Sequence, residues 1–212
     1  GFAYHAAQAL DFGSSAGGGS TGALVRSLLG AAPGEEAAVI AAHTADATWE
    51  ASRAAHVAVL LDVALSAEQR PIIDAMDHAT RVRGRDAALA GLVADAASES
   101  PLMIRLEDLH WADDVLLNDI RVLSETVGNE PVLLVLATRL GGDPVSEGRL
   151  RLSPDVPIVT LDLAPLPAEE AEALAADTFR VIARNVDALG YMRENFHAET
   201  GEGLYADHFA SW

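Results

Sequence analysis

The chain contains no cysteine and no lysine among its 212 residues. Without cysteine it forms no disulfide and offers no thiolate to a metal, which fits a reducing, cytoplasmic setting. All 14 basic side chains are arginine, against 32 acidic ones, so the formal net charge is −18. DNA, RNA and anionic membranes repel such a chain, and we therefore expect no nucleic-acid partner and no membrane partner.

Aromatic residues are scarce, at 5% of the chain, and no apolar run reaches the roughly 18 residues that a membrane span requires. The opening residues lack the charged and apolar regions of a signal peptide, which again favours the cytoplasm. Hydrophobic residues nevertheless make up 50% of the chain. That content is ample for a packed core.

Strand-like and helix-like segments alternate along the chain, which predicts an α/β fold: a parallel sheet with flanking helices. The runs at 101–107 and 131–137 are apolar without alternation, so we expect strands covered on both faces in a three-layer architecture. Further strands are predicted within 2–12 and at 158–163. Helices are predicted at 21–29, twice within 35–66, after a Ser66 cap, at 78–98, at 114–127 and from Pro167 onward.

The most informative stretch is Pro-Leu-Met-Ile-Arg-Leu-Glu-Asp-Leu-His-Trp-Ala-Asp at 101–113. It predicts a buried strand that delivers Glu107 and Asp108 to its carboxyl end, where ligands bind in parallel sheets. Two acids there are typical of a nucleoside-triphosphatase site, in which one holds Mg²⁺ and the other orients the attacking water. The alternative is a strand that simply ends in solvent through two acids. The adjoining His110 and Trp111 favour the nucleotide site.

Two other segments bear on a phosphate site. Thr138 and Arg139 directly follow the next apolar strand, where a polar tip either senses a γ-phosphate or simply faces solvent. The loop from Gly13 to Thr21 can be aligned with the phosphate-loop pattern GxxxxGK[ST], although Gly19 stands at the lysine position. Its amides could still bind an anion, and Ser20 could reach Mg²⁺. The simpler alternative is a connector before the next helix.

Three parts of the chain, 101–113, 131–139 and 158–175, resemble the signal-transduction ATPases with numerous domains, which are AAA-like P-loop NTPases. The string Leu-Glu-Asp-Leu-His-Trp-Ala-Asp is close to a signature of that family. The resemblance is closest to the ATPase segment of bacterial class III adenylate and guanylate cyclase regulators. It implies a core domain over 1–179 whose first strand and phosphate-loop helix are missing, and it makes the glycine-rich loop unrelated to phosphate binding.

The resemblance implies a nucleotide-binding regulatory module that takes ATP and Mg²⁺ and works with other domains of a multidomain signalling protein. Glu107 would be the Mg²⁺ ligand, Asp108 the water-polarising acid and Arg139 the sensor. Because the family's phosphate-loop lysine is absent, we expect impaired hydrolysis and leave open whether the chain is an enzyme.

The tail, 180–212, is more polar and resembles the end of α/α-barrel glycoside hydrolases. There Glu194 would fall near the catalytic base. The alternatives to a nucleotide module are therefore a hydrolase fragment that works through Glu194 and a non-catalytic interaction domain.

Overall fold

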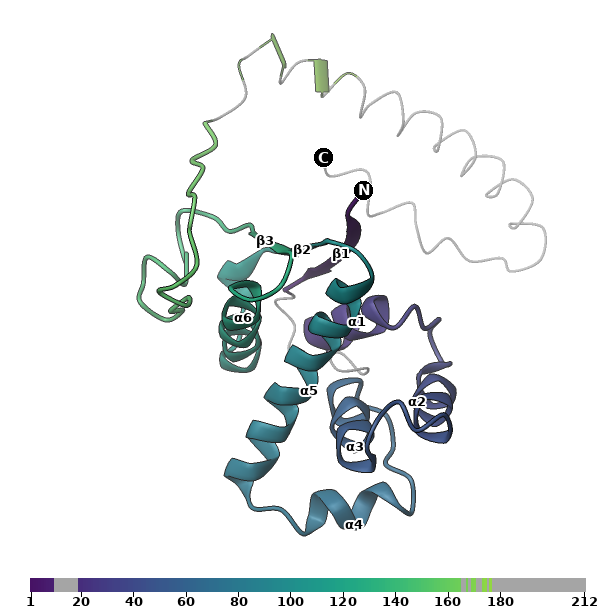
Figure 1. Cartoon of the computed structure of the whole chain (residues 1–212). Coiled ribbons are helices and arrows are strands. Elements are labelled where there is room, and N and C mark those ends of the chain that lie inside the picture. The colour runs from purple at the N-terminus through teal and green to yellow at the C-terminus, as the bar shows by residue number, and fades with distance from the viewer. Residues whose placement is uncertain (10–18, 165–166, 168, 171–172, 175, 177–212) are drawn as a thin grey trace, which may run out of the picture. The chain divides into compact units, whose positions relative to one another are not determined.

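A computed structural model describes the chain at residues 1–9, 19–164, 167, 169–170, 173–174 and 176. The chain divides into two units, Gly1–Ile158 and Val159–Trp212. The named helices and strands all belong to the first unit (Figure 1). The division falls earlier than the expected boundary after residue 179, and residues 179 and 180 lie outside the described part of the chain.

A three-stranded parallel sheet lies at the centre of the first unit. Its strands, in spatial order, are β1 (Ala3–Gln8), β2 (Leu102–Glu107) and β3 (Val132–Leu136). Ala3 lies opposite Leu102, and Leu102 lies opposite Val132. The structure thus confirms the expected α/β class and the strands expected within 2–12, 101–107 and 131–137.

Three of the described helices, α4, α5 and α6, begin where local capping chemistry predicts. Ser66 and Gln69 hydrogen-bond each other's backbone amides in a capping box at α4. Asp77 accepts from the Thr80 amide at the start of α5, and Asp113 accepts from the Leu116 amide at the start of α6. The helices are α1 (Gly19–Leu28), α2 (Glu36–Ala45), α3 (Ala51–Leu60), α4 (Gln69–Asp74), α5 (His78–Glu99), the 3₁₀ turn η1 (Leu109–Trp111) and α6 (Asp114–Val127).

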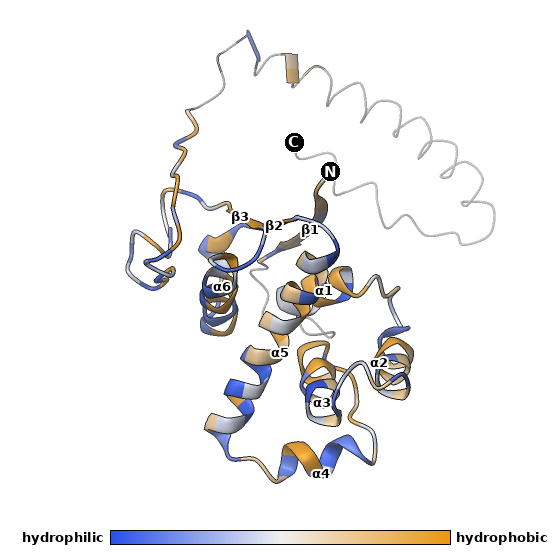
Figure 2. Ribbon diagram, viewed as in Figure 1, coloured by the Kyte–Doolittle hydropathy of each residue, from blue (hydrophilic) through white to orange (hydrophobic). Residues whose placement is uncertain are grey.

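The described helices cover one face of the sheet. In β2, Leu102, Ile104 and Leu106 are fully buried, whereas the alternate residues Met103 and Arg105 are half-buried. Helices α1, α5 and α6 contact one another, α1 also contacts β1 and α6 also contacts β3, and the three helices lie on the same side of the sheet (Figure 1). Figure 2 shows the apolar character of the strands that this layer packs against. A second covering layer, which the three-layer expectation requires, is not among the described residues.

The expectation of a strand at 158–163 is wrong. These residues are in neither a helix nor a strand, and Val159, Leu161 and Leu163 are 81%, 78% and 90% exposed. A strand forms only where a neighbouring backbone pairs with it, and the described part of the chain provides no such neighbour here. The helix expected from Pro167 is seen at the described residues Glu169, Glu170, Ala173, Leu174 and Ala176.

Among the described helices, none is long and apolar enough to cross a membrane.

Candidate functional site

The candidate site lies at the carboxyl edge of the sheet. Because the strands are parallel, the residues that follow β1, β2 and β3 meet there, and Gln8 is in register with Glu107. The backbone amide of Ala9 donates to the Glu107 carbonyl at 2.9 Å, and the amide of Leu109 donates to the Ala137 carbonyl at 3.1 Å. These bonds extend the sheet past the strand ends and fix the backbone on both sides of Asp108.

Asp108 adopts a left-handed backbone conformation, with φ 56° and ψ 39°. Aspartate tolerates this region better than most residues because its short polar side chain makes local hydrogen bonds. Here the amide nitrogen Nε2 of Gln8 donates to Asp108 Oδ2 at 2.6 Å. The Asp108 side chain remains 35% exposed. It is therefore a positioned carboxylate that solvent or a ligand can still reach.

Glu107 ends β2 on the face of the sheet that the described helices leave open. Its Oε1 lies 3.5 Å from Nε of Arg105, and its side chain is 40% exposed. Both groups are partly solvated, so this ion pair contributes little to stability. Glu107 and Asp108 thus have separate partners, Arg105 and Gln8, although they are adjacent in sequence.

His110 is buried next to this edge, in η1. Its side chain is 6% exposed, and Nδ1 lies 4.0 Å from Asp108 Oδ1, beyond hydrogen-bond distance. Neither ring nitrogen has a hydrogen-bond partner among the described residues. Gly142, at φ +86°, packs against the base of this residue: a Cβ built there would lie 3.2 Å from His110 Cβ. An unpaired buried imidazole is unfavourable. Among the described residues near this edge, the two ring nitrogens of His110 and Nε of Arg105 are buried without a hydrogen-bond partner.

Thr138 and Arg139 lie just beyond β3, and both are exposed. The structure brings them to the same sheet edge as Glu107 and Asp108, as the parallel arrangement predicts. Within the described part of the chain, Arg139 forms no ion pair.

Ser20 lies at the start of α1, and its hydroxyl donates to the Gln8 carbonyl at 2.7 Å. It is therefore linked through Gln8 to Asp108, which places it at the predicted edge. Gly19 begins the helix at φ +61°. Residues 10–18 lie outside the described part, so the proposed loop from Gly13 onward is seen only at its end. Both interpretations of the loop, as a phosphate loop and as a connector, remain predictions.

The described residues contain no group of three or more acidic or histidine side chains that could hold a metal ion. Glu107 and Asp108 supply oxygen ligands of the kind that Mg²⁺ prefers. However, one carboxylate faces Arg105 and the other is bonded to Gln8. Mg²⁺ would therefore depend on ligands from the nucleotide and from water.

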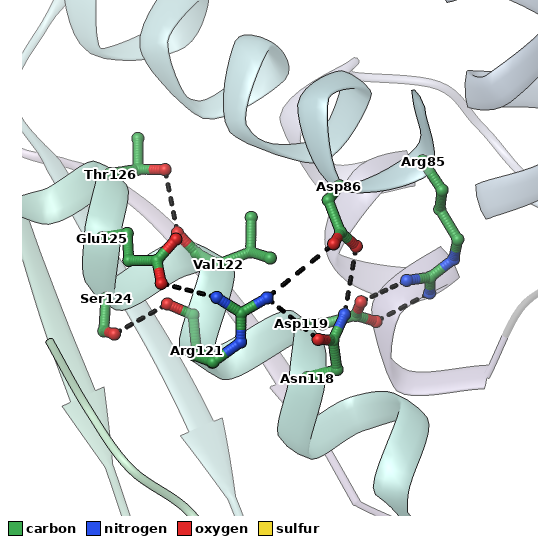
Figure 3. Close-up of polar contacts among 9 residues, drawn as sticks. All are labelled: Arg85, Asp86, Asn118, Asp119, Arg121, Val122, Ser124, Glu125 and Thr126. Atoms are coloured by element: carbon green, nitrogen blue, oxygen red, sulfur yellow. Dashed lines mark hydrogen bonds and ion pairs between the residues drawn. The ribbon is translucent and has the colours of Figure 1, made fainter. Parts of the chain in front are cut away.

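A second polar cluster, which sequence reasoning missed, is buried where α1, α5 and α6 meet. Asp119 of α6 is 1% exposed and forms a bidentate ion pair with Arg85 of α5, with Nη2 2.8 Å from Oδ2 (Figure 3). The Thr21 hydroxyl of α1 also donates to Asp119 Oδ2. Burial alone lowers the pKa of Arg85, but the hydrogen bonds and charge of Asp119 outweigh it and raise the pKa. This cluster joins three helices and is separate from the sheet edge.

An exposed network continues along α6. Nη1 of Arg121 lies 2.5 Å from Oε1 of Glu125, and Nη2 of Arg121 lies 3.8 Å from Oδ2 of Asp86. The side-chain amide of Asn118 donates to Asp86 Oδ1 at 3.0 Å (Figure 3). Arg121, Glu125 and Asp86 line a cavity of about 500 Å³ that extends to Glu130, which precedes β3. That position is at the opposite end of the sheet from Asp108, so the cavity does not belong to the candidate site.

The sequence contained a signal for Asp119. It lies three residues after Leu116 and four before Leu123, and both leucines are buried. An acid on the apolar side of a helix requires a buried partner. The sequence did not indicate the hydrogen bond between Gln8 and Asp108, because a glutamine at the end of a strand is usually solvated. Glu194 and the rest of the tail after residue 176 lie outside the described residues.

No protein-family model, curated protein or solved structure matches this chain.

Proposed function

We propose that the chain is a nucleotide-binding regulatory module with impaired hydrolysis. The observation that supports this most is Asp108, a partly exposed carboxylate fixed by Gln8 at the carboxyl end of the central parallel strand. Nucleotides bind at this position in parallel sheets. The proposal includes ATP and Mg²⁺ as ligands, a cytoplasmic location, and other domains of a multidomain signalling protein as partners.

The charges around the site support weak binding. The chain has no lysine, and of the arginines near this edge Arg105 faces Glu107, which leaves Arg139 as our candidate cation for the phosphates. A hydrogen bond to a charged group contributes about 1.5–3 kcal/mol. Loss of a lysine contact to the phosphates therefore weakens binding by about tenfold or more, since 1.4 kcal/mol corresponds to a factor of ten. Hydrolysis suffers further because that charge also stabilises the transferring phosphoryl group.

Titration with Mg-ATP, followed by NMR or calorimetry, tests the proposal. We expect saturable binding that is weaker than low-micromolar, with ATP turnover at the background rate. Asp108→Asn and Arg139→Gln should each reduce the binding. Asp155→Asn is the matched control and should leave the binding unchanged, because Asp155 is an exposed acid beside Val156, which lies against Gly128 ahead of β3 and so at the other end of the sheet.

Two results contradict the proposal. If Mg-ATP causes no saturable change at any concentration, the chain is not a nucleotide module. If Mg-ATP binds in the low-micromolar range, the loop from Gly13 to Thr21 is a working phosphate loop. In that case Gly19→Lys should tighten the binding further.

A further inference from the structure

Within the described part of the chain, the outer edge of β3 is open, and its five residues carry none of the side chains that protect such edges. Its sequence, Val-Leu-Leu-Val-Leu, contains no charge, proline or polar side chain. All five residues are exposed or partly exposed, and Leu133 is 46% exposed, whereas every second residue of the neighbouring β2 is fully buried. Natural proteins protect exposed edges with charges, prolines or bulges, because an open edge pairs with other strands. Figure 2 shows the apolar colour of this strand.

Odd- and even-numbered residues of β3 point their backbone N–H and C=O groups to opposite sides, which identifies the groups that do not bond to β2. Pro131 and Ala137 bond to β2, so the odd-numbered residues between them also face β2. The backbone groups of Val132, Leu134 and Leu136 therefore point outward. Of these, the Val132 amide bonds to the Glu130 carbonyl at 2.7 Å. Within the described chain, no strand pairs with this side of β3.

The other outer edge of the sheet differs. On β1 the even-numbered residues face outward by the same rule, and the Ser20 hydroxyl occupies the carbonyl of Gln8. His5 is bonded to Ser27 of α1 at 2.9 Å, so α1 lies along this strand. The two edges also differ in side chains, because β1 carries Tyr4, His5 and Gln8 whereas β3 is aliphatic throughout. β3 is therefore the edge better suited to an aliphatic partner strand.

We propose that β3 pairs antiparallel with β3 of a second copy of this chain across a twofold axis at Leu134. The outward residues then match: Leu134 faces its own copy, and Val132 faces Leu136 of the second copy. Each cross-strand pair is aliphatic, which favours sheet pairing. The result is one continuous six-stranded sheet.

The charges that flank β3 support a second copy as the partner. In this register Glu130 lies opposite Thr138 of the second copy, one residue from its Arg139. Neither Glu130 nor Arg139 has an ion pair within the described residues. The twofold axis thus brings two opposite charges together twice, whereas a parallel arrangement places Glu130 beside Glu130. The charge pairs set the register, and the aliphatic strand supplies the contact.

Light scattering during gel filtration provides the first test. We expect a species near twice the 22.2 kDa of one chain that dissociates on dilution. Leu134→Pro removes an outward amide without removing a bond to β2, so it should give a monomer. Ala6→Pro places a proline at an outward-facing position of β1 and is the matched control, which should remain dimeric.

Disulfide trapping tests the register of this pairing. Because the chain has no native cysteine, every disulfide that forms must involve the introduced cysteines. Leu133 and Val135 face each other across the axis as a pair that is not hydrogen-bonded, where the Cα atoms are about 4.5 Å apart. A mixture of the single variants Leu133→Cys and Val135→Cys should therefore form a mixed disulfide dimer faster than either variant alone.

The outcomes separate clearly. A monomer at all concentrations, or a dimer that survives Leu134→Pro, overturns the proposal. An open series of larger species, or no preference for the mixed disulfide, overturns the twofold register. If Leu134→Pro does not fold, the trapping experiment decides. None of these results depends on nucleotide binding, so failure here is distinct from failure of the proposed function.

Discussion

The imidazole of His56 occupies the space that a side chain at Gly84 would need. A Cβ built on Gly84 would lie 2.2 Å from His56 Nε2. The ring is 3% exposed and is held by a 2.8 Å hydrogen bond between Nδ1 and the Ser52 carbonyl. This contact sets how closely α3 approaches α5, and it explains a glycine in the middle of a 22-residue helix.

Gly84→Ala should therefore destabilise the fold, although alanine is the better helix former. Because the buried ring has nowhere to move, we expect a loss of about 1–3 kcal/mol in the free energy of unfolding. Gly91→Ala, on the same helix, is the control. Its new methyl meets the flexible end of Arg53 at 3.3 Å, so it should be neutral or add up to about 1 kcal/mol. Urea denaturation measures both, and equal effects would contradict the steric explanation.

Removing one member of the Arg85–Asp119 ion pair should destabilise the fold more than replacing both members with apolar residues. Asp119→Ala leaves the Arg85 guanidinium without its partner, and we expect a loss of about 3–5 kcal/mol. The double variant Arg85→Met/Asp119→Leu should recover most of that loss, because neither charge remains buried. Arg121→Ala removes the more exposed pair beside it and should cost about 1 kcal/mol or less. If the double variant is as unstable as Asp119→Ala, the ion pair is not the cause.

His110→Phe should leave stability unchanged or increase it. The variant keeps an aromatic ring and removes two buried nitrogens that lack hydrogen-bond partners among the described residues. His110→Ala, which leaves a cavity instead, should cost more than the phenylalanine variant. Thermal unfolding compares them. A loss of more than about 2 kcal/mol in His110→Phe would show that the nitrogens are satisfied, for example by bound water.

Stability should fall in acid partly through the cap of α5. Hydrogen bonding from Thr80, first through its backbone amide, lowers the pKa of Asp77 below its ordinary 3.8. A carboxyl group whose pKa is lower in the folded than in the unfolded protein stabilises the fold at pH values above its unfolded-state pKa. This stabilisation is lost as the pH falls through its folded-state pKa. Wild type should therefore lose more stability below pH 3.8 than Asp77→Asn, which keeps a capping oxygen but does not titrate. Urea titrations on both sides of that pH measure the difference, and parallel curves would contradict it.

Local signals in the sequence predicted local structure well. Ser66 with Gln69 marked the start of α4, and Asp113 preceded α6 as its cap. Strand formation depends on partners, so the sequence alone was a poorer guide there. The apolar segment at 158–163 has the composition of a strand but no strand beside it in the described chain.

The site shows the same limit. Glu107, Asp108, Thr138 and Arg139 meet at one edge because parallel topology requires it, and the sequence could indicate that. The bond from Gln8 to Asp108 joins residues 100 positions apart, and no local pattern carries that information. Asp119, which is the buried acid among the described residues, was detectable only as an exception to the apolar spacing of its helix.

The sheet register has a consequence for how the chain folds as it is synthesised. Ala3 pairs with Leu102, so β1 emerges from the ribosome long before its partner exists. At about 5–20 residues per second, β1 waits for about 5–20 seconds. The helices between the two strands, α1 to α5, are complete before β2 emerges. Because pairing between residues so far apart in sequence slows folding, we expect the pairing of β1 with β2 to be a late and slow step.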